Sequence, residues 1–343
     1  MRILALLLIL AAASKSFAQG KPQPLKKVNE IEIPQGKYHM ELPDRWNPKV
    51  PTPVIVFMHG KTVDLNVDNA KGQLGNAFVL GMKKRGYIAV CPVMPKEHRP
   101  HWWENGGSLE ILDAMMKDVR SKVTVSYMLC SGFSAGANYT IGFGQHRSYH
   151  QYFAGYMVGA GGGWVDAQGP EDLKRKPIWL GCGDQDNDTY DDKLNTTGGA
   201  RKTFKEMKDA SFEVTYDEFP KLGHVMDAKM VEKQLAWVDL HTPTFQCYGA
   251  LQRAAEVKAM QPGVAISQLE VIAKIKPLEY WKKKADAELA ALTDAAKKTI
   301  AGAEAITDAA AAKAELTKII EQYRDSSVEK LVKDALGRVS NRK

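Results

Sequence analysis

The pentapeptide Gly132-Phe133-Ser134-Ala135-Gly136 is the feature that most constrains the fold of this chain. It follows an apolar run at 125–130, which has the composition of a buried strand, and precedes a segment at 137–146 that has few helix breakers. A serine between two glycines at a strand-to-helix turn is typical of a nucleophile elbow, where the turn leaves no room for flanking Cβ atoms. The alternative is a glycine-rich turn without chemistry, and the flanking elements argue against it.

An acidic loop follows a second apolar run, at 176–182. Three aspartates lie in this loop: Asp184, Asp186 and Asp188. The carboxyl end of a buried strand is where the acid of a Ser-Asp-His set is expected, in that chain order. The other aspartates of the loop would then cap the turn that follows.

The third member of this Ser-Asp-His set is a histidine. After a third strand-like run at 212–216, the loop 220–224 ends in Gly223-His224, and a helix is expected at 227–240. His224 there can reach over Ser134, whose hydroxyl is a poor nucleophile until an imidazole takes its proton. A buried carboxylate fixes the tautomer of that imidazole and stabilises its charged form.

The developing oxyanion of such a reaction needs backbone N–H donors aimed at it. One donor is expected from Ala135, which directly follows the serine. The strand-like run at 53–58 ends in His59-Gly60, and we assign the second donor to Lys61, with Thr62 as the alternative. His59 itself is expected to brace this loop rather than to act in catalysis.

With these motifs in place, residues 37–240 resemble the α/β-hydrolase superfamily, and most of all its secreted carboxylesterase, feruloyl-esterase and phospholipase/carboxylesterase-like branch. The matching stretches are PVIVFMHG, GYIAVCPVMP, GFSAG, GCGDQD and KLGH. The resemblance implies an α/β fold with a mostly parallel sheet flanked by helices. We expect no cofactor. It also favours Asp186 as the acid, because family acids lie three residues after the glycine that ends the strand.

The N-terminus predicts export. Arg2 precedes an apolar run of 11 residues at 3–13, and small residues stand at Ser16 and Ala18. This pattern indicates a signal peptide at 1–18, cleaved near Ala18, and a secreted or periplasmic mature protein. No later apolar run approaches the ~20 residues of a transmembrane helix.

The composition changes after about residue 247, where alanine, lysine and glutamate dominate. We therefore expect a catalytic domain at 19–246 and a small all-α appendage at 247–343, with helices at 266–275, 285–306 and 309–339. The last carries an apolar stripe at helical spacing. These helices either only stabilise the catalytic domain, which we favour, or dock a partner.

Other features carry weaker hypotheses. Two adjacent tryptophans, Trp102 and Trp103, lie in a polar loop after the run 87–95 and are expected either to line the substrate pocket or to anchor the loop. No metal-ligand spacing occurs, and three of the four cysteines lie in strand-like runs, which favours no structural disulfide. The net charge of +7 over 343 residues does not indicate nucleic acid as a ligand.

The sequence therefore predicts a secreted serine hydrolase that cleaves carboxylic esters through an acyl-enzyme on Ser134, His224 and Asp186. The substrate would be a small-molecule, carbohydrate or lipid ester. The alternatives are a peptidase of the same fold, or an inactive scaffold that acts as a binding protein.

Overall fold

The computed structural model describes residues 25–60, 69–93, 107–187 and 196–342. Its body is one eight-stranded sheet in the order β1-β2-β4-β3-β5-β6-β7-β8. The strands are β1 (Val28–Ile33), β2 (Gly36–Glu41), β3 (Thr52–Met58), β4 (Ile88–Val93), β5 (Val125–Phe133), β6 (Gly155–Gly159), β7 (Ile178–Gly183) and β8 (Val214–Phe219). β2 pairs antiparallel with β1 and β4, and all other pairs are parallel. This arrangement is the α/β-hydrolase fold, so the predicted fold class is confirmed.

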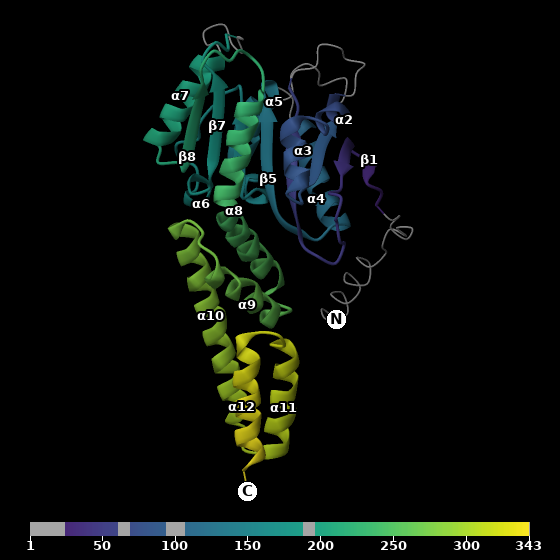
Figure 1. The fold of residues 1–343 in the computed structure, drawn as a ribbon. Helices are drawn as coiled ribbons and strands as arrows, with labels where there is room; N and C mark the ends of the chain where they lie inside the picture. The colour runs from purple at the N-terminus through teal and green to yellow at the C-terminus, as the bar shows by residue number, and fades with distance from the viewer. Residues whose placement is uncertain (1–24, 61–68, 94–106, 188–195, 343) are drawn as a thin grey trace, which may run out of the picture.

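Helices cover both faces of the sheet (Figure 1). They are α2 (Asn69–Gln73), α3 (Ala77–Lys84), α4 (Gly107–Lys122), α5 (Ala135–Gln145), α6 (Glu171–Lys174), α7 (Thr196–Asp209), α8 (Ala228–Val257), α9 (Pro262–Glu270), α10 (Glu279–Glu304), α11 (Ala309–Gln322) and α12 (Ser327–Ser340), with 3-10 turns η2 (His150–Tyr152) and η3 (Ile272–Lys274). Buried side chains of α4, α5 and α7 share a core with one face, and those of α2, α3 and α8 share a core with the other.

The alternation of a strand explains these two cores. Val54, Val56 and Met58 of β3 point into one core, whereas Ile55 and Phe57 point into the other. Because both faces are covered, the strand is a continuous apolar run rather than an alternating one. This is why the run at 53–58 could be recognised in the sequence.

Helix α8 is longer than expected. The sequence predicts its end near Leu240, but the helix continues through Pro243 to Val257. A proline inside a helix costs about 3 kcal/mol. Phe245 and Cys247, both fully buried, lie just beyond it and pack into the body, and this burial offsets that cost.

The C-terminal helices extend away from one end of the body (Figure 1). Their distal part has a core of its own, to which Ile266 of α9, Ile300 of α10, Leu316 of α11 and Val332 of α12 contribute. Their proximal part does not: Leu269 of α9 is buried in the same core as β5 and α8. The expected boundary between residues 246 and 247 therefore falls inside one helix and one core.

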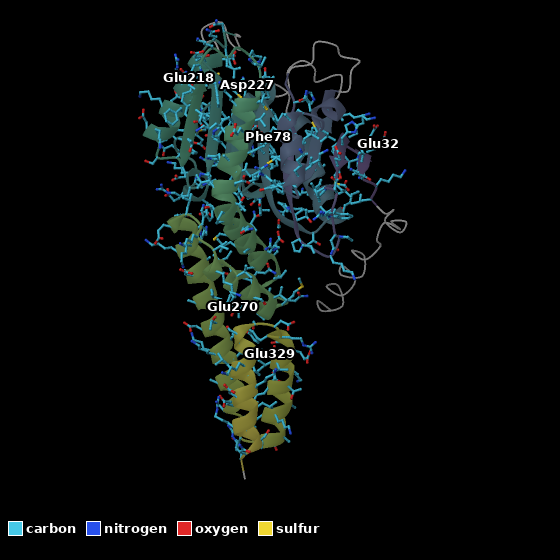
Figure 2. The ribbon with its side chains drawn as sticks, in the orientation of Figure 1. Glu32, Phe78, Glu218, Asp227, Glu270 and Glu329 are labelled. Carbon is cyan, nitrogen blue, oxygen red and sulfur yellow. The ribbon has the colours of Figure 1, made fainter. Side chains whose placement is uncertain are left out.

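The helix expected at 309–339 is in fact two helices. Asp325 has a φ of 63°, in the left-handed region that ends a helix, and Ser326 precedes α12. The Glu270 carboxylate, labelled in Figure 2, accepts a hydrogen bond of 3.2 Å from the Ser327 N–H. Because the two helices fold back on α10, most of the predicted apolar stripe is covered by the bundle itself.

Lys176, in the turn between α6 and β7, is fully buried in the body. Its Nζ donates to the His150 carbonyl oxygen and, at 3.1 Å, to the Tyr248 hydroxyl. Burial lowers the pKa of this amine well below its ordinary value, although Asp172 nearby acts in the opposite direction. Nothing in the sequence marked this lysine as a core residue.

No helix in the described part of the chain is both long and apolar enough to cross a bilayer. The four cysteines are buried, and no disulfide joins two described residues.

Candidate active site

The turn between β5 and α5 holds Ser134 in a strained conformation. Its φ is 56° and its ψ is −123°, which few residues other than glycine adopt without cost. The Ser134 N–H donates to the Gly159 carbonyl oxygen of β6 at 2.9 Å, so the neighbouring strand helps to hold the turn.

The two glycines of the motif are required by close backbone approaches. A Cβ on Gly132 would lie 2.2 Å from the Gly136 carbonyl oxygen, and one on Gly136 would lie 2.1 Å from the Met58 carbonyl oxygen. Both distances are far below van der Waals contact with atoms that cannot rotate away. The strand, turn and helix therefore form the sharp elbow that the sequence predicted, with β3 packed against its back.

His224 lies in the loop between β8 and α8, and its imidazole meets the serine. Its Nε2 is 2.8 Å from Ser134 Oγ. Its Nδ1 is 3.0 and 2.9 Å from the two carboxylate oxygens of Asp186. The ring also packs on Phe133, with centroids 5.1 Å apart. The structure thus brings together the serine, histidine and aspartate that the sequence analysis had selected.

Asp186 follows β7 and is fully buried. The Thr197 N–H donates to its carbonyl oxygen at 3.2 Å, which ties the acid loop to the start of α7. The Cys182 sulfur lies 3.6 Å from Asp186 Oδ2, and burial together with that carboxylate raises the pKa of the thiol to about 12. The Thr197 hydroxyl also donates to the Asp186 carbonyl oxygen, at 2.7 Å. Sequence reasoning assigned no role to Thr197, nor to Cys182 within the GCGDQD stretch.

Asp184, the competing acid, has a different contact. Its Oδ1 accepts a 2.6 Å hydrogen bond from the Lys221 N–H, in the loop that carries His224. Lys221 has a φ of 61°, so this bond holds a strained residue near the histidine. Asp188 lies outside the described residues.

Ala135 is the first residue of α5, so its N–H belongs to the helix N-terminus next to the serine, where donors have no intrahelical acceptor. A Cβ on Gly60 would lie 3.3 Å from Ser134 Cβ, so the chain after β3 also passes beside the serine. The expected donor Lys61 and its alternative Thr62 lie outside the described residues, as do Trp102 and Trp103.

This geometry suits proton transfer from a hydroxyl to an imidazole that a carboxylate orients. No cluster of three or more metal-ligating side chains occurs among the described residues. The carboxyl ends of the parallel strands, where the serine lies, face away from the C-terminal helices (Figure 1).

No family model matches the chain, and neither does any curated protein. Many solved structures share features of the fold. A thermostable esterase is 17% identical with a TM-score of 0.43, over 57% of this chain and 54% of its own. Est1E from Butyrivibrio proteoclasticus is 12% identical with a TM-score of 0.44, over 64% of this chain and 99% of its own. A putative dipeptidyl aminopeptidase IV from Bacteroides ovatus is 17% identical with a TM-score of 0.47, over 65% of this chain and 36% of its own. The fold assignment follows from the strand order and pairing of the sheet.

Proposed function

We propose that this protein is a serine hydrolase that cleaves carboxylic esters through an acyl-enzyme on Ser134. The observation that carries the proposal is the chain of contacts from Ser134 Oγ through His224 to the buried Asp186. Each contact is within hydrogen-bond distance, and the three residues come from three separate loops at one edge of the sheet.

In the first half-reaction, Ser134 Oγ attacks the ester carbonyl carbon while His224 Nε2 takes the hydroxyl proton. The carbonyl oxygen becomes an oxyanion, to which the Ala135 N–H and a second backbone donor from residues 61–62 would donate. The tetrahedral species collapses, the C–O bond to the alcohol breaks, and His224 returns its proton to the leaving alkoxide.

In the second half-reaction, water attacks the acyl-enzyme and His224 takes its proton. Collapse then releases the carboxylic acid and restores the Ser134 hydroxyl. Asp186 accepts from His224 Nδ1 and stabilises the imidazolium that forms twice in each cycle.

We favour ester cleavage over peptide cleavage because no domain is inserted between β6 and β7. Peptidases of this fold commonly gate their substrates with a propeller or lid domain. Between β6 and β7, the chain forms only the four-residue helix α6. An inactive binding scaffold is disfavoured, because nothing in such a scaffold would maintain the strained serine in contact with a histidine and a buried acid.

The test is hydrolysis of p-nitrophenyl esters of increasing acyl length by the mature chain from residue 19, beside aminoacyl p-nitroanilides. We expect ester turnover that Ser134→Ala removes. Faster cleavage of the anilides would favour the peptidase alternative, and ester turnover that survives in the alanine variant would overturn the mechanism. We further propose that residues 1–18 direct export and are removed.

A further inference from the structure

A shallow pocket of about 390 Å³ lies between the loop after β6 and helix α7, apart from the serine. It is lined by Trp164, Val165, Ala167, Glu206, Asp209 and Ala210. The indole of Trp164 is 70% exposed, whereas the other tryptophans in the described ranges are buried or half-buried. An exposed indole offers a flat apolar face and a polar N–H, and tryptophan is a frequent anchor at binding surfaces.

The loop that carries Trp164 is fixed on both sides of the indole. Gln145, at the end of α5 and only 3% exposed, donates to the Trp164 carbonyl oxygen at 2.7 Å and accepts from the Asp166 N–H at 2.7 Å. Val165, between them, is buried in the core, and the Gly163 N–H donates to Thr203 Oγ1 at 2.8 Å. Because the backbone is already ordered, the indole can bind a ligand with little further loss of conformational freedom.

The charges around the indole select the kind of ligand. Glu206 and Asp209 are 43% and 65% exposed, and each has a lysine partner one turn away on α7. Lys202 Nζ lies 4.0 Å from Glu206, and Lys205 Nζ lies 2.7 Å from Asp209. The lining itself carries two carboxylates and no cation, and the two lysines that balance them lie outside it. This disfavours an anionic ligand, and the carboxylate oxygens can accept hydrogen bonds from the hydroxyl groups of an uncharged one.

A pyranose ring is an uncharged ligand that has both an apolar face and several hydroxyl donors. Its C–H face fits the flat indole, and its hydroxyls fit the carboxylates at the rim. We propose that the Trp164 pocket binds sugar units of a neutral polysaccharide.

The pocket is an exosite rather than part of the active site. Gln145 is the last residue of α5, whose first residue follows Ser134, and 11 helical residues span about 16 Å. A polymer held at Trp164 would keep its ester side groups near the serine at a raised local concentration. That consequence rests on the proposed esterase function, but the binding itself does not.

Binding is tested in the mature chain carrying Ser134→Ala, so that no substrate is consumed. Affinity electrophoresis through gels containing soluble xylan, mannan or mixed-linkage glucan measures Kd for each. We expect retardation by at least one polysaccharide, Kd about tenfold or more higher after Trp164→Ala, and a smaller effect for Trp164→Phe. Leu240→Ala, which truncates a 73% exposed side chain on α8, is the matched control and should migrate as the parent does.

Migration of the parent unaffected by all three polysaccharides would overturn the proposal, as would an unchanged Kd for Trp164→Ala with an unchanged Tm. A second arm uses the active chain. There Trp164→Ala should leave kcat/KM for a soluble p-nitrophenyl ester unchanged, because the indole is remote from the serine. If the active chain hydrolyses no ester, but polysaccharide retards the Ser134→Ala chain and this retardation depends on Trp164, the proposed esterase function fails while the exosite stands.

Discussion

Replacing Trp281 by alanine tests whether the C-terminal helices share one core with the hydrolase body. Trp281, near the start of α10, is 1% exposed and packs edge-on against Tyr248 of α8, with ring centroids 5.0 Å apart. Its indole N–H donates at 2.8 Å to the carbonyl oxygen of Arg175, the residue that follows α6. The side chain therefore connects the first turn of α10 to the body.

The cost of the change follows from these contacts. Truncating a buried tryptophan to alanine removes about 3–5 kcal/mol from the free energy of unfolding. The lost hydrogen bond to Arg175 adds ~1 kcal/mol. At about 2 °C for each kcal/mol in a chain of this size, the Tm of the body should fall by roughly 10 °C.

Differential scanning calorimetry measures this shift, with Leu316→Ala as the control. Leu316 is also fully buried, but it lies in the distal core of α10, α11 and α12. We expect Trp281→Ala to lower the temperature at which the sheet unfolds, and Leu316→Ala to act mainly on the distal helices. An unchanged unfolding temperature of the body in the Trp281 variant would refute the shared core.

Three further predictions follow from the site and its surroundings. Asp186→Asn should lower kcat by about 10⁴-fold, because the histidine then takes the wrong tautomer. Asp184→Asn should lower kcat far less. If steady-state kinetics show the larger loss for Asp184→Asn, then Asp184 is the catalytic acid. Gly136→Ala should abolish both folding of the elbow and ester turnover, because its Cβ would lie 2.1 Å from a backbone oxygen. In the same helix, a Cβ on Gly142 would meet nothing within 4 Å, so Gly142→Ala should raise the free energy of unfolding in urea by about 0.5–1 kcal/mol. Lys176→Met should raise the free energy of unfolding at pH 7, because folding then no longer desolvates an amine whose pKa burial lowers. The lysine binds a proton in the unfolded chain but binds it poorly when buried, so the free energy of unfolding of the parent should rise with pH up to the ordinary lysine pKa. The stability difference in favour of the methionine variant should shrink over that pH range. A difference that grows with pH would contradict this.

The parts of this molecule that depend on short stretches of sequence were predictable. The elbow could be recognised because two glycines, a serine and the flanking strand and helix lie within about 20 residues, and each glycine has a steric reason. The parallel strands could be recognised because burial on both faces makes them continuous apolar runs. The order of serine, aspartate and histidine then limited the choice of partners.

What could not be predicted depends on contacts between distant residues. Lys176 reads as a surface residue until Tyr248, 72 positions later, covers it. Pro243 reads as a helix end until the burial of the residues beyond it is known. Cys182 and Thr197 contact Asp186 only because β7 and α7 pack together, and the GCGDQD stretch gives no sign of that packing.

The central claim is that Ser134 forms a covalent acyl-enzyme, and an active-site-directed fluorophosphonate tests it most directly. The mature chain is incubated with the probe, digested, and the modified peptide is located by mass spectrometry. We expect one adduct, on Ser134, with no labelling of Ser134→Ala and greatly slowed labelling of His224→Ala, because the hydroxyl then lacks its base. An adduct on another serine, or a Ser134→Ala protein that is labelled as fast as the parent, would contradict the account.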